Sequence, residues 1–562
     1  MDYLRAISSY GLGLWDQGRL SSVAALGVPL GVLFHLTIAQ MGDVESFMYT
    51  LIAAMLFLMF GIVSISMLLG SSFLGASAGL CVLARTFNAG LFSSMVIYRL
   101  FFHRLRKFPG PFDLKISRFF SVLRVAKEVK YHNDVAKMHE KYGDFIRTGP
   151  RELCIVRDSA IPIIYGPNTN CHKPVAYMGA SADSKKASLH SSQDPNDHKR
   201  RHRAWDKGFS IKALQTYEPR IRTLVTKLVR QISHKKVLDA TAWSMYLNFD
   251  IMGEVGFGKD FGCVSSGTNH PAIQSLRDHM HIVGVLSYIP WLLNIFGHIP
   301  GASKAYRPFL VYCQSQVEEK REDIDLEKYP QDIMTWLLKA VIEKDISASP
   351  TEKSLSEDAR TLIVAGSETS ATVLASALFY LAKFPRVLKK LQAQIDDIIP
   401  TPADWTYEKA KAIAYLDNVI DETQRLKPAL LTGGYRRTPP EGIQIDEQFI
   451  PGNVSVIVPI QLIQTHPRYW KQSMDFIPER FGERSAEMGT SEAPYMPFSQ
   501  GTYGCPGKNL ALMTLRIAIS SLAQHFDITF AADETGEIFD KEAKDVFTTS
   551  LEPLNLQFSP RK

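Results

Sequence analysis

Hydrophobic residues form long uninterrupted runs within the first 107 positions. The run 47–69 carries no charged side chain and is long enough to cross a bilayer as one helix. The run 23–40 is shorter and contains Pro29, and a third run is usable over 86–102, because a charge such as Arg85 is costly at mid-bilayer. The pattern predicts a membrane anchor of two to three helices with these candidate spans.

Positive charge follows the third span directly, at Arg104, Arg106 and Lys107. Because basic residues flank spans on the cytoplasmic side, we expect the rest of the chain to face the cytosol. The stiff segment Phe108-Pro-Gly-Pro-Phe112 disfavours a continuous helix because of its prolines and glycine, and it predicts a domain boundary. We expect an anchor at 1–107 and a second domain at 108–562. A buried soluble bundle is the alternative for the anchor. A cleaved signal peptide fits poorly, because Asp2 lies in its basic region and the apolar runs continue too far.

Polar and apolar positions in 108–562 alternate mostly with the period of a helix. Short runs of strand character occur at 145–147, 153–157, 443–445 and 454–459. The pattern predicts a mainly α fold with minor β. The helical segments are Ile221–Ser233, Ser354–Phe384, Arg386–Ile399, Tyr415–Leu426 and Lys508–His525.

Composition excludes several functional classes. The chain has 63 Lys and Arg against 57 Asp and Glu, a net charge of +6, and no long basic tract, so it does not suggest a nucleic-acid partner. Its six cysteines show no paired spacing, which argues against a secreted disulfide scaffold and for reduced thiols.

One cysteine stands in a glycine-rich loop, Phe498-Ser-Gln-Gly-Thr-Tyr-Gly-Cys-Pro-Gly507, directly before a predicted helix. The helix dipole and free N–H groups there favour the thiolate of Cys505. No second Cys or His lies nearby, so a zinc or iron–sulfur site lacks ligands. A single thiolate suits haem, whose porphyrin supplies the other four ligands. The alternative is a buried structural thiol.

In this motif the chain resembles the cytochrome P-450 family of haem-thiolate monooxygenases. The resemblance implies that Cys505 is the axial ligand of haem b iron and that Phe498, Gly501, Tyr503 and Gly507 shape the haem loop. It also implies a structural triad, in which Glu422 and Arg425 of a Glu-x-x-Arg helix pair with Arg480 of Pro478-Glu-Arg-Phe481.

The predicted long helix carries Ala365-Gly-Ser-Glu-Thr-Ser370, which matches the family segment on the distal side of the haem. The resemblance implies that Gly366 lets the helix open locally, and that Glu368 and Thr369 supply the acid and the hydroxyl of a proton relay. A solvated polar patch on a helix is the alternative.

Two positions depart from the family pattern of basic residues that contact the haem propionates. Tyr503 stands where Arg or His is usual, and the Trp-x-x-x-Arg helix aligns on His198 and His202. Arg437 fits the remaining position. Residues 199–203 equally fit a solvated basic face, and a basic face would suit an acidic redox partner.

The resemblance implies the fold and activity of a multi-pass, endoplasmic-reticulum monooxygenase, most like fungal microsomal members. Electrons would come from NADPH through a separate reductase, with cytochrome b5 as an additional donor. The substrate pocket would lie among loops 147–192, 257–300 and 428–435 and take a lipophilic molecule, such as a terpenoid, polyketide or alkaloid of secondary metabolism. Detoxification of aromatics, a haem-thiolate isomerase or dehydratase that needs no reductase, and a non-enzymatic haem sensor are the alternatives.

Overall fold

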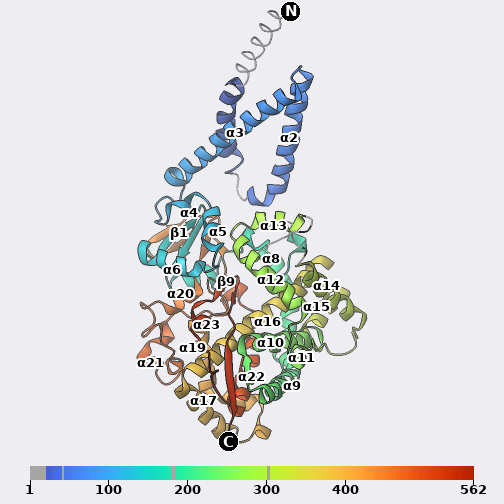
Figure 1. The fold of residues 1–562 in the computed structure, drawn as a ribbon, viewed down its shortest axis with the longest axis vertical. Helices are drawn as coiled ribbons and strands as arrows, with labels where there is room; N and C mark the ends of the chain where they lie inside the picture. Colours follow the sequence, from blue (N-terminus) through green and yellow to red (C-terminus); the bar gives the residue numbers. More distant parts are fainter. Residues whose placement is uncertain are drawn as a thin grey trace, which may run out of the picture. The chain divides into compact units, whose positions relative to one another are not determined.

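The computed structural model describes residues 21–40, 44–178, 184–299, 301, 304 and 306–561, and the chain forms two units (Figure 1). The first unit contains the residues up to Arg118 together with 147–150, and the second contains 119–146 and the chain from Arg151 onward. The compact first unit extends past the predicted hinge at 108, and the division into an anchor at 1–107 and a domain at 108–562 stays a prediction. Within the first unit the N–H of Arg147 donates to the carbonyl of Pro109 at 2.7 Å, and its guanidinium donates to the carbonyl of Arg99 at 2.8 Å.

The first unit is helical. The helix Ser21–Thr37 is apolar but shorter than a bilayer span, while α2 (Met48–Leu68) and the stretch Phe73–Phe102 are long and apolar enough to cross a membrane. That stretch consists of α3 (Phe73–Ile97) and one π-helical turn, and α4 (Phe112–Ile116) follows. No residue of α2 is buried, so its apolar side chains suit a lipid environment. The three predicted spans fall on these three helices.

The first helix packs closely on α3 through glycines. A Cβ atom on Gly31 would lie 2.1 Å from the carbonyl oxygen of Phe87, and one on Gly90 would lie 2.2 Å from that of Val28. The imidazole Nδ1 of His35 and the hydroxyl of Ser94 are 2.8 Å apart in a hydrogen bond. Small residues and a polar contact of this kind are typical of helix pairs within membranes.

The second unit is mainly helical, as predicted. Its long helix α16 lies against α10, α19 and α22 (Figure 1). A third helix that is apolar enough to span a membrane, Glu352–Lys383, is this α16, and it is largely buried in the unit. Its helices are α5 (Phe119–Val125), α6 (Tyr131–Tyr142), α7 (Ala160–Tyr165), α8 (Pro195–Gly208), α9 (Ile211–Lys235), α10 (Ala240–Phe257), α11 (Cys263–Ser266), α12 (Pro271–Leu286), α13 (Pro290–His298), α14 (Arg307–Glu322), α15 (Ile333–Ile342), α16 (Glu352–Lys383), α17 (Pro385–Ile398), α18 (Tyr407–Ala412), α19 (Ala414–Leu426), α20 (Ile460–Thr465), α21 (Ser485–Met488), α22 (Lys508–His525) and α23 (Glu537–Lys541).

The five predicted helices are confirmed, with one large difference in length. The helix predicted from Ile221 begins ten residues earlier, at Ile211, because the Ser210 hydroxyl accepts the N–H of Ala213 and caps its first turn. Helix α16 begins with a capping box in which Thr351 and Ser354 exchange side-chain bonds to each other's N–H groups.

The strands form small sheets, and those near the C-terminus were not predicted. Strand β7 pairs in parallel with β2 and antiparallel with β4, and β11 lies between β3 and β8. Two hairpins, β5–β6 and β9–β10, complete the set. The strands are β1 (Phe145–Gly149), β2 (Glu152–Ile155), β3 (Val237–Asp239), β4 (Arg436–Arg437), β5 (Ile443–Ile445), β6 (Gln448–Ile450), β7 (Ser455–Ile457), β8 (Phe526–Phe530), β9 (Lys544–Val546), β10 (Thr548–Ser550) and β11 (Asn555–Pro560).

Candidate active site

The loop that carries Cys505 is held by its own backbone. The N–H of Cys505 donates to the carbonyl of Phe498 at 2.9 Å, and Gly507 is the cap residue of α22. Gly501 has a positive φ of 62°, and a Cβ there would lie 2.5 Å from the carbonyl of Gly166. Only glycine therefore fits this turn against the end of α7. The loop glycines fix where the thiol points.

The thiol of Cys505 is surrounded by protein and still keeps accessible surface. Its side chain keeps accessible surface, yet burial raises the pKa of the thiol, while N–H groups of Gly507 and Lys508 and the Lys508 charge oppose that rise. Both properties hold together for a side chain surrounded by protein that still borders a hollow. The N–H groups directed at sulfur suit a thiolate that is neutralised by a metal.

The residues present fit a haem. Among the residues that the structure describes, no group of three or more His, Cys, Asp or Glu side chains could hold a metal ion. A protein-only metal site at Cys505 would lack ligands, whereas a porphyrin brings four of its own.

A buried cluster of basic groups surrounds Tyr503, two residues before the cysteine. The Lys173 Nζ and the Arg436 guanidinium each lie 4.9 Å from the Tyr503 ring centre, and the rings of His198 and Tyr503 are 4.7 Å apart. Lys173 donates to the carbonyls of His190 at 2.7 Å and Leu189 at 3.3 Å. Burial, followed by the charges of Arg436 and Arg201, lowers the pKa of Lys173 well below its usual range.

Among the described residues, no carboxylate bonds to this basic cluster, and several of its buried polar atoms lack a hydrogen-bond partner. The hydroxyl of Tyr503, Nε of Arg436 and Nδ1 of His198 are buried without a hydrogen-bond partner. Burial, with Lys173 and His202 adding to it, lowers the pKa of His198 to about 2, so its imidazole is neutral. Buried donors beside uncompensated positive charge require an anion. The two carboxylates of a haem meet that requirement.

Strand register decides which arginine joins the cluster. Successive residues of β4 point to opposite faces, and it is Arg436 that faces Tyr503. The predicted residue, Arg437, instead donates to the side-chain oxygen of Asn453 at 2.7 and 3.1 Å. The structure does not bring Arg437 to Tyr503.

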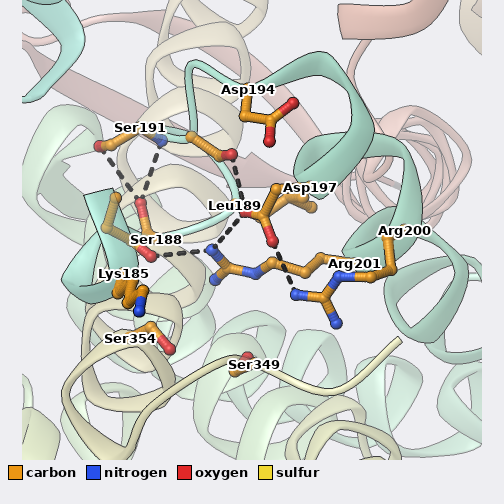
Figure 2. A network of polar contacts seen from close by, with 12 residues as sticks. Lys185, Ser188, Leu189, Ser191, Asp194, Asp197, Arg200, Arg201, Ser349 and Ser354 are labelled. Atoms are coloured by element: carbon orange, nitrogen blue, oxygen red, sulfur yellow. Dashed lines mark hydrogen bonds and ion pairs between the residues drawn. The ribbon is translucent and has the colours of Figure 1, made fainter. Parts of the chain in front are cut away.

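The basic residues of α8 also differ from one another in burial and in the partners that they contact. His202 lies one turn beyond His198 and pairs with Asp206 at 3.0 Å, partly exposed. Arg201 is fully buried and pairs with the buried Asp358 of α16 at 2.7 Å, so the segment is not a plain solvated face. Figure 2 shows the Arg201 side chain extending toward the segment 185–191, where it donates to the carbonyl of Ala187 at 2.9 Å.

The three residues of the predicted triad are fully buried and in contact. Arg425 Nε lies 2.7 Å from one Glu422 oxygen, and Arg480 Nε lies 3.0 Å from the other. Arg425 also donates to the carbonyl of Gln464 at 3.0 Å, and the side-chain oxygen of Gln464 accepts the N–H of Met496 at 2.9 Å. Met496 lies two residues before Phe498, so this chain of bonds links the triad to the cysteine loop.

Gly366 serves close packing in this structure. Helix α16 is continuous through it, and a Cβ at this position would lie 2.2 Å from the sulfur of Met252 on α10. The expected local opening of the helix is not seen, and a part for Gly366 in catalysis stays a prediction.

Glu368 and Thr369 lie on adjacent sides of α16. The carboxylate of Glu368 is buried and accepts the hydroxyl of Thr548 at 2.7 Å, and burial raises its pKa. Thr369 is partly exposed and donates to the carbonyl of Ala365 at 2.6 Å. Ala365, one turn before Thr369, is exposed although most of the residues that follow it in α16 are buried. Glu368 also lines a cavity of about 230 Å³ together with Arg277, Lys544 and Glu552.

The sequence alone does not identify three residues of the site: Lys173, Thr548 and Arg436. For Arg436, the sequence does not distinguish it from its neighbour Arg437. Lys173 and Thr548 lie in segments far along the chain from the residues they meet. Arg436 stands in Tyr435-Arg-Arg-Thr438, where only strand register separates it from its neighbour.

The chain is similar in sequence to a known protein family and to several named members of it. The family model "Cytochrome P450" matches residues 109–558. "Cytochrome P450 monooxygenase orf5" of Eupenicillium brefeldianum is 36% identical over 84% of this chain and 94% of the relative. "Cytochrome P450 monooxygenase notG'" of Aspergillus versicolor is 31% identical over 85% and 87%. "Tryprostatin B 6-hydroxylase" of Neosartorya fischeri is 31% identical over 81% and 82%.

The match covers most of the chain, and the relatives are fungal monooxygenases that align over nearly their whole length. The geometry around Cys505 agrees with the cofactor of that family. The chain therefore belongs to the cytochrome P450 family, and it is an oxidoreductase of the monooxygenase type whose family cofactor is a haem-thiolate.

Proposed function

We propose that this protein is a membrane-anchored monooxygenase that inserts one oxygen atom from O2 into a lipophilic molecule of fungal secondary metabolism. One observation carries the proposal: the Cys505 thiol lies near the N–H groups of Gly507 and Lys508, beside a buried basic cluster to which no carboxylate of the described residues bonds. That arrangement suits the iron ligand at one point and the haem carboxylates at another.

Some residues of the site would hold the cofactor, and others would move protons. Cys505 would ligate the iron, and Lys173 and Arg436 would neutralise the carboxylates of haem b. The haem supplies the reaction of O2 with a C–H bond. The Glu368 carboxyl, whose pKa burial raises, can hold a proton at Oε and pass it through water to the Thr369 hydroxyl. Thr548 orients that carboxyl through its 2.7 Å bond.

Membrane attachment and the electron source are parts of the same proposal. Two apolar helices, and a third that is shorter, precede the catalytic unit, and Arg104, Arg106 and Lys107 follow them. That order supports an endoplasmic-reticulum anchor with the catalytic unit in the cytosol. Electrons come from NADPH through a separate membrane-bound reductase, with cytochrome b5 as an additional donor.

The printed name of one relative bears on the substrate. A "Tryprostatin B 6-hydroxylase" aligns with 81% of this chain, which supports a tailoring hydroxylation. We therefore infer a terpenoid, polyketide or alkaloid skeleton as the substrate class.

The first test is the reduced, carbon-monoxide-bound difference spectrum of the full chain in yeast microsomes. We expect the strongly red-shifted Soret band of thiolate-ligated haem, and its loss in Cys505→Ala, because alanine removes the only proposed protein ligand. Cys313→Ala is the matched control, since Cys313 is a buried thiol on α14. A band that persists in Cys505→Ala, or folded protein without haem, contradicts the proposal.

Reductase dependence separates monooxygenation from the alternatives. A monooxygenase forms product only when NADPH and reductase are both present. An isomerase or dehydratase would turn over without either one, and product formation under those conditions would replace the proposed reaction.

A further inference from the structure

A second cavity, of about 360 Å³, lies beside the β9–β10 hairpin, which turns at Phe547. Residues of α6, α20 and α23, which are labelled in Figure 1, line it together with residues at the two ends of the hairpin. Its volume is in the range of small-molecule sites. None of the lining residues belongs to the proposed haem site or to the proposed proton relay. The cavity is therefore a candidate site for a different ligand.

Two lysines share one carboxylate at this cavity. Lys427 Nζ lies 2.7 Å from one oxygen of Asp540, and Lys383 Nζ lies 2.9 Å from the other. Burial lowers the pKa of Lys427, Asp540 opposes that shift, and the charge of Lys383 adds to it. In the described part of the chain, neither lysine pairs with a second carboxylate. One positive charge is left without a partner of opposite sign.

The other ion pairs at the cavity are balanced. Lys541, which lines it, lies 2.5 Å from Glu537, and Lys130 lies 2.5 Å from Glu542 beside it. Each of these two lysines has a carboxylate of its own. Because a buried charge is costly unless it is paired, the excess charge at Lys427 favours a ligand that carries one negative charge.

His132 adds a donor that carries no charge. It lines the cavity from α6, and burial, with Lys130 adding to it, lowers its pKa to about 4, so the imidazole is neutral near pH 7. Its Nδ1 has no hydrogen-bond partner among the described residues. A neutral imidazole carries one N–H, which can reside on either nitrogen. An oxygen of a ligand can accept that N–H.

The rest of the lining includes an apolar part. Leu431, Ala543 and Leu551 contribute hydrocarbon surface to the same cavity that Lys427 and His132 line. A few polar groups among apolar side chains are typical of sites for small organic molecules, in which the polar groups set the orientation of the ligand. A bare inorganic anion would leave this apolar surface unused.

We propose that this cavity binds a small organic monocarboxylate, whose carboxylate bonds to Lys427 and to the N–H of His132. Its apolar body packs on Leu431 and Leu551. A phosphate monoester fits less well, because its second negative charge would exceed the one unpaired lysine charge and would face Asp540. The site is separate from the reaction centre and does not rest on the proposed function.

The test compares 2-naphthoate with 2-naphthamide, an uncharged analogue of the same shape, by isothermal titration calorimetry of the full-length haem protein. Clotrimazole, whose azole nitrogen ligates haem iron, is added first so that neither probe binds beside the haem. We expect one 2-naphthoate per chain, bound about ten-fold more tightly than 2-naphthamide, as for one charge-assisted bond. In Lys427→Met the two dissociation constants become equal.

His132→Phe is the second variant, because Lys427 also holds Asp540 of α23 and its loss can unfold the chain. It should weaken the binding of 2-naphthoate about five-fold, the net effect of one hydrogen bond. Lys390→Met is the matched control, since Lys390 on α17 pairs with Glu479 and Glu483 and does not line the cavity. Both probes should bind this control as they bind the wild type.

Absence of 2-naphthoate binding, or equal affinity of the wild type for both probes, overturns the inference. An unchanged preference for 2-naphthoate in folded Lys427→Met does so as well. Where Lys427→Met does not fold, unchanged 2-naphthoate affinity in His132→Phe overturns it. Loss of the carbon-monoxide spectrum from the wild type contradicts the proposed function and leaves the calorimetry, repeated without clotrimazole, to decide on this site.

Discussion

At the scale of single residues, the site depends on a lysine with an unusual environment. Lys173 is enclosed, donates only to carbonyls in the described contacts, and lies over Tyr503 where the family has a basic residue. We expect its charge to compensate for the altered position when haem is bound, because a buried ammonium and a buried carboxylate satisfy each other far better than either does alone.

Lys173→Met tests this compensation. Methionine keeps the unbranched shape and most of the length of the side chain and removes its charge, so we expect haem to transfer to apomyoglobin about ten-fold faster, as for loss of one charge-assisted bond. Lys199→Met, an exposed lysine on α8, is the control and should leave the rate unchanged. An unchanged rate in Lys173→Met would show that the charge does not hold the haem.

Some residues of the site can be identified from sequence motifs, and the others only from the three-dimensional structure. Cys505 and the triad Glu422, Arg425 and Arg480 are recognisable because their chemistry needs fixed residue types at fixed local spacing. Arg436 is not, since two adjacent arginines differ only in the face of β4 that they occupy. Lys173 and Thr548 meet their partners through loop geometry, which local sequence patterns do not encode.

At the scale of elements, α6 contains two histidines that the fold keeps neutral. Burial, with Lys130 adding to it, lowers the pKa of His132 to about 4, and burial likewise lowers that of His139 to about 4 although the carbonyl of Gly143 opposes the shift. In the unfolded chain both titrate near 6.5. Below pH 6.5 the unfolded state therefore binds more protons than the folded state does.

The sign of the pH dependence follows from this. The contribution of these histidines to stability is complete above pH 6.5 and is lost as the pH falls toward 4, by up to about 1.4 kcal/mol per histidine per pH unit. We expect His132→Gln together with His139→Gln to flatten the decline in unfolding free energy between pH 6.5 and 4. Denaturant unfolding across that range measures it, and a parallel decline in both proteins would contradict the assignment.

The periodicity of hydrophobic residues predicted the long helices well and the late strands poorly. Helix α16 is long and capped, so its pattern is unambiguous over many turns. Strands β9 and β10 have three residues each, too few for a period of two to stand out. The hairpin that carries Phe547 was missed for this reason.

At the scale of the whole molecule, the number of membrane spans decides where the N-terminus lies. With three spans, the N-terminus is on the opposite side from residue 108, and with two it is on the same side. The close packing of Ser21–Thr37 on α3 through Gly31 and Gly90 favours three. We expect an epitope tag at the N-terminus to be protected from protease in sealed microsomes and digested after detergent is added.

A tag at the C-terminus is the control and should be digested in sealed microsomes. Digestion of both tags before detergent would indicate two spans. Release of the protein by alkaline carbonate would contradict the anchor itself.

The β9–β10 hairpin has a consequence for how enzymes of this kind diversify. Its backbone is bonded to Ala429, to Thr372 and to the Asp545 carboxylate, and none of these bonds uses the side chain of Phe547. The scaffold is thus independent of the residue displayed at its tip. Related enzymes can therefore carry different residues at this turn while each keeps the bonds that form the hairpin.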